Sequence, residues 1–255
     1  MDHHTTWLSF LPGYAAFEAF VRSIQPAGLL GTPVVVQHVL AAALTALFVL
    51  FLAWRTHRSL TAGGTMEGLV PGPEVSVRNV VEVLAEMLLR QMKQIIGPEA
   101  TRYFPVLFTL TLFILFSNLL GLVPGFTPPT DNWNTTFACS IFVFVYFNYH
   151  GLRVHKWGHI THLANPVGEW WGWFLAPLMF PLETVSMMVR PVSLGIRLGA
   201  NMLGDHAVLG AFVGLLPFFL PIPIMALGLL VCVVQTTIFV VLTMIYLKLS
   251  VQETH

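Results

Sequence analysis

The longest uncharged stretch of this chain restricts its fold more than any other feature. Residues 207–247 contain no Asp, Glu, Lys or Arg. About 20 apolar residues are enough for a helix to span a bilayer, so a run of this length belongs in a membrane. The composition agrees, because 56% of the 255 residues are hydrophobic and 9% are charged, whereas soluble domains carry about 25% charged residues. We predict an all-α polytopic membrane protein.

The apolar segments predict about five membrane-crossing helices in a single membrane domain, 1–255. We expect an extracytoplasmic N-terminal segment over 1–33, a first span over 34–54, a two-span hairpin over 104–150, and two long helices over 170–216 and 221–248. The last two exceed the length that a perpendicular span needs. They must therefore be strongly tilted, broken or partly outside the hydrocarbon core. Pro177, Pro181 and Pro191 offer break points in the first of them.

Residues 78–96 have a different pattern. Apolar residues recur there every three or four positions, with Glu82, Glu86, Arg90 and Lys93 between them. This spacing is typical of an amphipathic helix that lies on the membrane or against a partner, and we expect an interfacial helix here.

The distribution of Lys and Arg predicts the orientation. Residues 55–102 carry six of the twelve, and the connection 151–169 carries Arg153 and Lys156, whereas 123–134 and 217–223 carry none. Because Lys and Arg accumulate in cytoplasmic loops, we place the N-terminus outside and the C-terminus in the cytoplasm. The net charge is zero, so nothing in the overall charge points to nucleic acid.

A row of polar side chains interrupts the segment 170–216. At 100° per helical residue, its members lie within about 40° of Glu183 on one helix face, and His206 lies further round, at about 140°. A charge at the centre of a bilayer costs about 2.5–3.5 kcal/mol, and residues kept there usually have a function. This polar stripe consists of Glu183, Arg190, Arg197, Asn201 and Asp205, bordered by Ser186 and Ser193.

Arg197 lacks a carboxylate partner in its own segment. Even Asp205 is eight residues away, about 12 Å along a helix axis. The last segment supplies no acid, but its Gln235 is placed to hydrogen-bond Arg197 or Asn201. The missing carboxylate then belongs to another protein. The alternative is an interhelical seam in which the polar groups of this chain satisfy one another.

These residues match a known family. The stretch "PVSLGIRLGANMLGDH", followed by "VVQTTIFVVLTMIYLKLS", resembles subunit a of the membrane sector of F-type ATP synthases. The likeness begins near residue 75, and the stretches "SNLLGLVPG" and "PPTDNWNTT", with Asn118 and Asp131, also resemble the family. The family signature, Ser-Leu-x-x-Arg-Leu-x-x-Asn and Gln-x-x-x-Phe, is present here as Ser193, Leu194, Arg197, Leu198, Asn201, Gln235 and Phe239.

The resemblance implies a non-catalytic, ion-translocating subunit in the inner (plasma) membrane, with no cofactor and with H⁺ as the favoured ion. It implies a c-subunit ring, peripheral-stalk b subunits and lipid as partners, and the F1 sector indirectly. Arg197 would face a ring carboxylate and separate two half-channels. Asn201, His206 and Gln235 would line the outer half-channel, with Asn118 near it; Glu183, Ser186 and Arg190 would belong to the cytoplasmic one.

The sequence departs from the family at one pair of positions. Many members pair a carboxylate at the position of His206 with a histidine on the last helix, and others swap the two. Here the second position is Gly228. We expect Asp205, beside His206, to supply the missing acid.

Two other classes of protein remain as alternatives. His155, His159 and His162 share a helix face at spacings of four and three, as metal ligands in a membrane oxidase would, but such enzymes need several clusters, and we expect no metal. A stand-alone channel or secondary transporter would explain the polar stripe but not the paired arginine and glutamine motifs. The chain has no nucleotide-binding motif, so we do not expect it to hydrolyse ATP.

Overall fold

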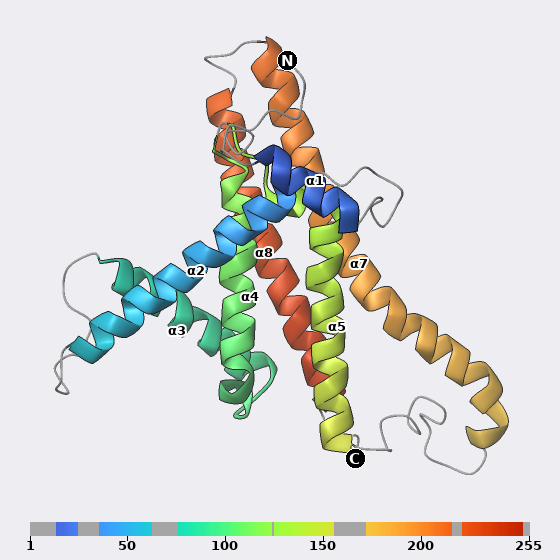
Figure 1. Cartoon of the computed structure of the whole chain (residues 1–255). Helices are drawn as coiled ribbons and strands as arrows, with labels where there is room; N and C mark the ends of the chain where they lie inside the picture. Colours follow the sequence, from blue (N-terminus) through green and yellow to red (C-terminus); the bar gives the residue numbers. More distant parts are fainter. Residues whose placement is uncertain are drawn as a thin grey trace.

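A computed structural model describes residues 14–24, 36–62, 76–123, 125–155, 172–215 and 221–251, and every regular element in this part is helical. The helices are α1 (Tyr14–Ile24), α2 (Val36–Ala62), α3 (Val77–Ile95), α4 (Ala100–Leu120), the short 3₁₀ helix η3 (Pro129–Asp131), α5 (Trp133–His155), α7 (Gly172–Leu215) and α8 (Pro221–Val251). Figure 1 shows α4, α5 and α8 side by side, with α7 running antiparallel to α8.

Helix α3 is the predicted amphipathic helix. Its first turn is capped by Ser76, whose hydroxyl accepts a hydrogen bond from the Asn79 N–H, and such a cap contributes about 1 kcal/mol. Its apolar side buries Leu88 and Met92. On its polar side, two ion pairs join residues four apart, Arg78 to Glu82 and Glu86 to Arg90. The helix packs against α4 and, with fewer contacts, against α2 and α8.

The core lies where α4, α5, α7 and α8 meet. A buried apolar cluster extends through these helices and includes Tyr103, Leu107, Leu198, Phe239 and Met244. Two glycines let α7 approach α5 closely. A methyl group at Gly195 would lie 2.9 Å from Ser140 Oγ, and one at Gly199 would lie 3.3 Å from Thr136 Oγ1. Glycine is therefore the residue that this helix crossing requires.

Helix α7 passes through Pro177, Pro181 and Pro191 without a break. Its 44 residues span about 66 Å at 1.5 Å per residue. Its length predicted a helix that is tilted, broken or partly outside the hydrocarbon core. The helix is not broken at any of its three prolines. Figure 1 shows the helix running obliquely, with its N-terminal half leaning away from α5.

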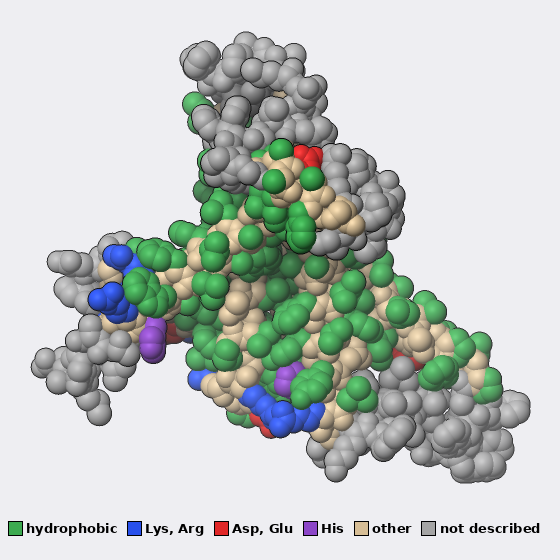
Figure 2. All heavy atoms as spheres, in the orientation of Figure 1, with side chains coloured by type: hydrophobic (Ala, Val, Ile, Leu, Met, Phe, Trp, Pro, Cys, Tyr) green, Lys and Arg blue, Asp and Glu red, His purple; other side chains and the backbone are tan. Residues whose placement is uncertain are grey.

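Three helices in the described part are long and apolar enough to cross a membrane: Val36–Ser59, Ala100–Leu120 and Ile222–Val251. The five predicted crossings also require α5 and α7, and this number stays a prediction. Helix α2 extends to Ala62, beyond the predicted end of the first span at residue 54, and the predicted N-terminal segment 1–33 contains α1. On the face in Figure 2, hydrophobic side chains cover most of the described surface and Lys and Arg gather toward the lower end of the view and at the far end of α2.

Candidate functional site

The polar stripe lies at the border between two other faces of α7. The buried face includes Leu194, Leu198 and Met202, about 20° to 100° round the helix from the stripe's centre in one direction. In the other direction lies an apolar face that is exposed to its surroundings from Leu182 to Leu203. This exposed face includes Leu182, Val185, Val189, Val192, Ile196 and Leu203.

Asn201 and Gln235 join α7 to α8. The Asn201 side-chain amide donates a hydrogen bond of 2.5 Å to Gln235 Oε1, as one of the two predicted pairings requires. Gln235 is 2% exposed, and its Nε2 has no hydrogen-bond partner in the described part of the chain. A buried amide that lacks a partner costs about 1–3 kcal/mol. Gln235 therefore keeps an uncommitted donor at the contact between the two helices.

Arg197 lies one helical turn before Asn201, and its side chain is half-buried. Among the described residues, no carboxylate forms an ion pair with its guanidinium. In the alternative interpretation, an interhelical polar seam, the polar groups of this chain would pair with one another. Arg197 has no such ion pair among the described residues. An arginine stays charged in any protein environment, so its charge is open to an acid from outside this chain.

Asp205 lies against Gly228. A methyl group built at Gly228 would be 2.9 Å from Asp205 Oδ2 and 2.8 Å from Leu122 Cδ2. The Asp205 carboxylate therefore fills the space that a side chain at position 228 would take. This contact explains in steric terms how an acid at 205 and a glycine at 228 fit together.

Asn118 belongs to a buried hydrogen-bond chain rather than to the Asn201–Gln235 contact. The Thr130 hydroxyl donates to Asn118 Oδ1 at 2.7 Å, and Asn118 Nδ2 donates to Thr236 Oγ1 at 3.3 Å. Thr236 donates in turn to the Cys232 carbonyl at 2.7 Å. These bonds tie η3, α4 and α8 together, and Asn118 and Thr130 are almost completely buried.

Asp131 is a polar residue of this region to which the sequence analysis gave no role. It ends η3, which packs against α7, and burial raises the pKa of its carboxyl while the charge of His206 lowers it in part. Asp131 Oδ1 and His206 Nε2 are both buried and have no hydrogen-bond partner within the described residues. One signal was available in the sequence: Asp131 is the single charged residue in 103–152.

Glu183, Ser186 and Arg190 lie on the part of α7 that leans away from α5 (Figure 1). Glu183 and Arg190 are half-buried and Ser186 is exposed. The Arg190 guanidinium lies 5.7 Å from the centre of the Tyr246 ring of α8, a cation–π distance. The structure therefore separates these three residues from the group at Asn201–His206.

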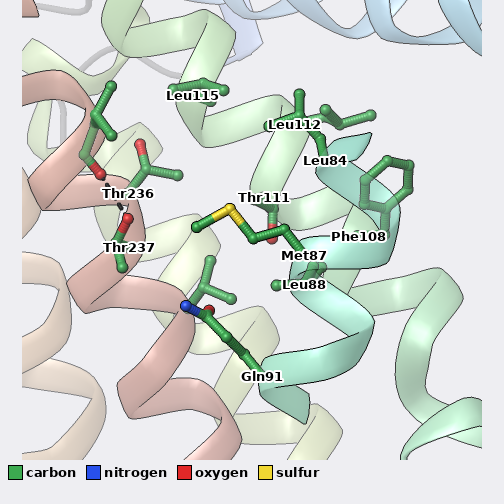
Figure 3. Close-up of a pocket in the computed structure, with 12 residues that line it drawn as sticks. Leu84, Met87, Leu88, Gln91, Phe108, Thr111, Leu112, Leu115, Thr236 and Thr237 are labelled. Carbon is green, nitrogen blue, oxygen red and sulfur yellow. Dashed lines mark hydrogen bonds between the residues drawn. The ribbon is translucent and has the colours of Figure 1, made fainter. Parts of the chain in front are cut away.

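A cavity of about 120 Å³ lies on another side of α8, between that helix, α3 and α4 (Figure 3). Three threonines contribute to its wall, Thr111, Thr236 and Thr237. Each donates its hydroxyl hydrogen to the carbonyl four residues earlier, at 2.7 to 2.8 Å. The remaining wall is mainly Leu, Met, Phe and Val, so this cavity is apolar and distinct from the polar stripe.

The histidine cluster of the metal alternative falls outside what the structure describes. His159 and His162 lie outside the described residues, and so does the side chain of His155.

Comparison with known proteins identifies the family. The profile of the ATP synthase A chain family matches residues 36–248. ATP synthase subunit a of Sorangium cellulosum is 42% identical over 73% of this chain and 72% of its own length. ATP synthase subunit a 1 of Syntrophotalea carbinolica is 44% identical over 73% of this chain and 76% of its own length. ATP synthase subunit a of Bdellovibrio bacteriovorus is 40% identical over 73% of this chain and 80% of its own length. The chain belongs to the ATP synthase A chain family.

Proposed function

We propose that this chain is the proton-conducting stator subunit a of the membrane sector of an F-type ATP synthase. It stands beside a c-subunit ring and is held by peripheral-stalk b subunits in the inner membrane, and the catalytic F1 sector depends on it indirectly. The observation that carries the proposal is Arg197, a charge without an ion pair among the described residues, one turn from the Asn201–Gln235 contact.

The resemblance to the family suggests the parts of the path, and the charges of this chain are consistent with them. Asn201, Asp205, His206 and Gln235, with Asn118 near them, form the outer half-channel, through which a proton reaches a ring carboxylate and neutralises it. Glu183, Ser186 and Arg190 form the cytoplasmic half-channel, through which the proton leaves after the ring has turned. Arg197 attracts the deprotonated carboxylate between the two channels and repels a proton that would cross directly, because its charge persists where a buried lysine could lose it.

The exposed apolar face of α7 supports a partner in the membrane plane. It includes Leu182, Val189 and Ile196, which lie about 60° to 100° round the helix from Arg197. A ring helix packed there would cover apolar side chains and bring its carboxylate toward Arg197. Lipid covers the parts of this face that the ring leaves free.

Replacing Arg197 by Ala tests the proposal. We expect Arg197→Ala to abolish proton-coupled ATP synthesis and to allow a passive proton leak, since the positive barrier between the half-channels is lost. The measurement is ATP synthesis and proton flux in reconstituted complexes. Arg153→Ala, which removes an exposed arginine at the end of α5, is the matched control and should remain coupled. Full coupling in the Arg197 variant would contradict the proposal.

Disulfide trapping tests the ring contact itself. A cysteine at Asn201, in a background without Cys139 and Cys232, should cross-link rapidly to a cysteine beside the carboxylate of the c subunit. A chain that transports ions in liposomes without a ring would instead favour the alternative, a stand-alone channel or secondary transporter.

A further inference from the structure

The connection between α4 and α5 brings an acid next to His206. Asp131 Oδ1 and His206 Nε2 have no hydrogen-bond partner in the part of the chain that the structure describes, and both atoms are buried. A buried carboxylate oxygen without a hydrogen-bond partner costs free energy. Helices α2, α4, α5 and α7 pack against η3. Among their titratable groups, His206 interacts electrostatically with the Asp131 carboxyl, and it also interacts with Asp205.

The residue before Asp131 is held by a buried hydrogen-bond chain through α4 to α8. This residue, Thr130, donates to Asn118 of α4, which donates to Thr236 of α8. Thr130 and Asn118 are at most 1% exposed and Thr236 is 3% exposed, so water does not compete for these bonds. Asn118 and Thr236 each make two hydrogen bonds, and the backbone at 130 positions Asp131 against α7.

We propose that Asp131 is a further proton-relay residue of the outer half-channel, and that Thr130, Asn118 and Thr236 are its positioning residues. This inference rests on the proposed function. In the relay, the protonated Asp131 carboxyl gives its proton to His206, and the imidazolium releases a proton toward Asp205. Asp131 is then reprotonated from the outer solution, so one proton enters for each that moves on.

Replacing Asp131 by Asn tests this role. Asn keeps the size of the side chain but cannot carry a proton, and positioned acids and bases contribute about 10²–10⁴ to proton transfer. We expect Asp131→Asn to lower proton flux from the outer side by about 10-fold or more, and Asp131→Glu to restore part of it. Glu86→Gln, at an exposed ion pair of α3, is the control and should keep full flux.

The pH profile separates a relay from a structural effect. Because burial raises the pKa of Asp131, its titration should form one limb of the flux profile, at a higher pH than for an exposed aspartate. We expect that limb to disappear in Asp131→Asn and to remain in Asp131→Glu. An Asp131→Asn profile identical to the wild type would overturn the inference.

The positioning residues supply an independent test that leaves the loop sequence intact. Thr236→Val removes the acceptor of Asn118, whereas Thr237→Val removes a hydroxyl that bonds its own helix in the same way but makes no contact with Asn118. We expect outer-side flux to fall about 3- to 10-fold in Thr236→Val, as for a lost buried hydrogen bond, and to stay unchanged in Thr237→Val. Equal flux in the two variants would contradict the positioning role.

The same assays distinguish the inference from the proposed function. If Asp131→Asn and Thr236→Val match the wild type while Arg197→Ala loses coupling, the relay is wrong and the function stands. If Arg197→Ala remains coupled, the proposed function itself fails.

Discussion

At the scale of single residues, Gln235 is a buried polar group that links α7 to α8. Its oxygen is committed to Asn201 and its amide hydrogens have no partner among the described residues. A glutamine has no titratable proton, so it cannot act as a relay acid or base. Its contribution is to hold Asn201 and to offer a donor to a group that passes between α7 and α8.

Replacing Gln235 by Leu should therefore slow proton transport without abolishing it. The change removes one hydrogen bond with a net value of about 0.5–1.5 kcal/mol, which corresponds to a loss of about 2- to 13-fold. Proton pumping driven by ATP hydrolysis, measured in vesicles beside Arg197→Ala, checks this. A loss as complete as that of Arg197→Ala would give Gln235 the larger role.

At the scale of elements, the approach of α7 to α5 determines where the polar stripe lies. Gly195 and Gly199 permit the crossing, and Ser140 and Thr136 of α5 lie opposite them. A side chain at either glycine would push α7 away and move Arg197, two residues from Gly195, relative to α8. The position of the site therefore depends on two residues that carry no polar group.

We expect Gly195→Leu to reduce assembly of the complex. Overpacking a close contact costs about 1–3 kcal/mol, and the first added carbon would already lie 2.9 Å from Ser140 Oγ. Gly210→Leu is the matched control on the same helix, because a methyl group there meets nothing within 4 Å. The measurement is the yield and thermal stability of the purified complex, and equal values for both variants would show that the crossing tolerates a larger residue.

The sequence predicts helices better than it predicts their contacts. Apolar periodicity and uncharged length located α3, α7 and α8 to within about three residues. Gln235 was expected to bond Arg197 or Asn201, and it bonds Asn201. Asp131 was not given a role, because its neighbours are distant in sequence and no spacing rule connects a loop to position 206. The fit of Asp205 to Gly228 likewise depends on the packing of two helices. The continuity of α7 through three prolines reflects its surroundings more than its local propensity.

At the scale of the whole molecule, the exposed arginines indicate how the chain lies in the membrane. Arg102 near the start of α4 and Arg153 near the end of α5 are both exposed, and Lys and Arg gather toward the lower end of the view in Figure 2. The end of a membrane protein at which Lys and Arg gather is typically cytoplasmic. The turn with Val123 then faces outward, together with η3.

Labelling with a membrane-impermeant thiol reagent tests this orientation and the five crossings together. In a background without Cys139 and Cys232, we expect Ser23→Cys and Val123→Cys to react from outside, and Arg153→Cys and Leu249→Cys only after the membrane is opened. All four positions are exposed. Labelling of Arg153→Cys from outside would mean that α5 does not cross.

Helix α8 presents three consecutive polar residues to three different neighbours. Gln235 bonds Asn201 of α7, Thr236 bonds Asn118 of α4, and Thr237 lines the cavity beneath α3. Successive residues point about 100° apart. The bonds of Gln235 and Thr236 to two different helices therefore fix the rotation of α8 about its own axis. Turning the helix by one position would break both bonds at once, at about 0.5–1.5 kcal/mol each. Under the proposed function a ring would turn past α8, and these two bonds would hold the helix against rotation about its own axis.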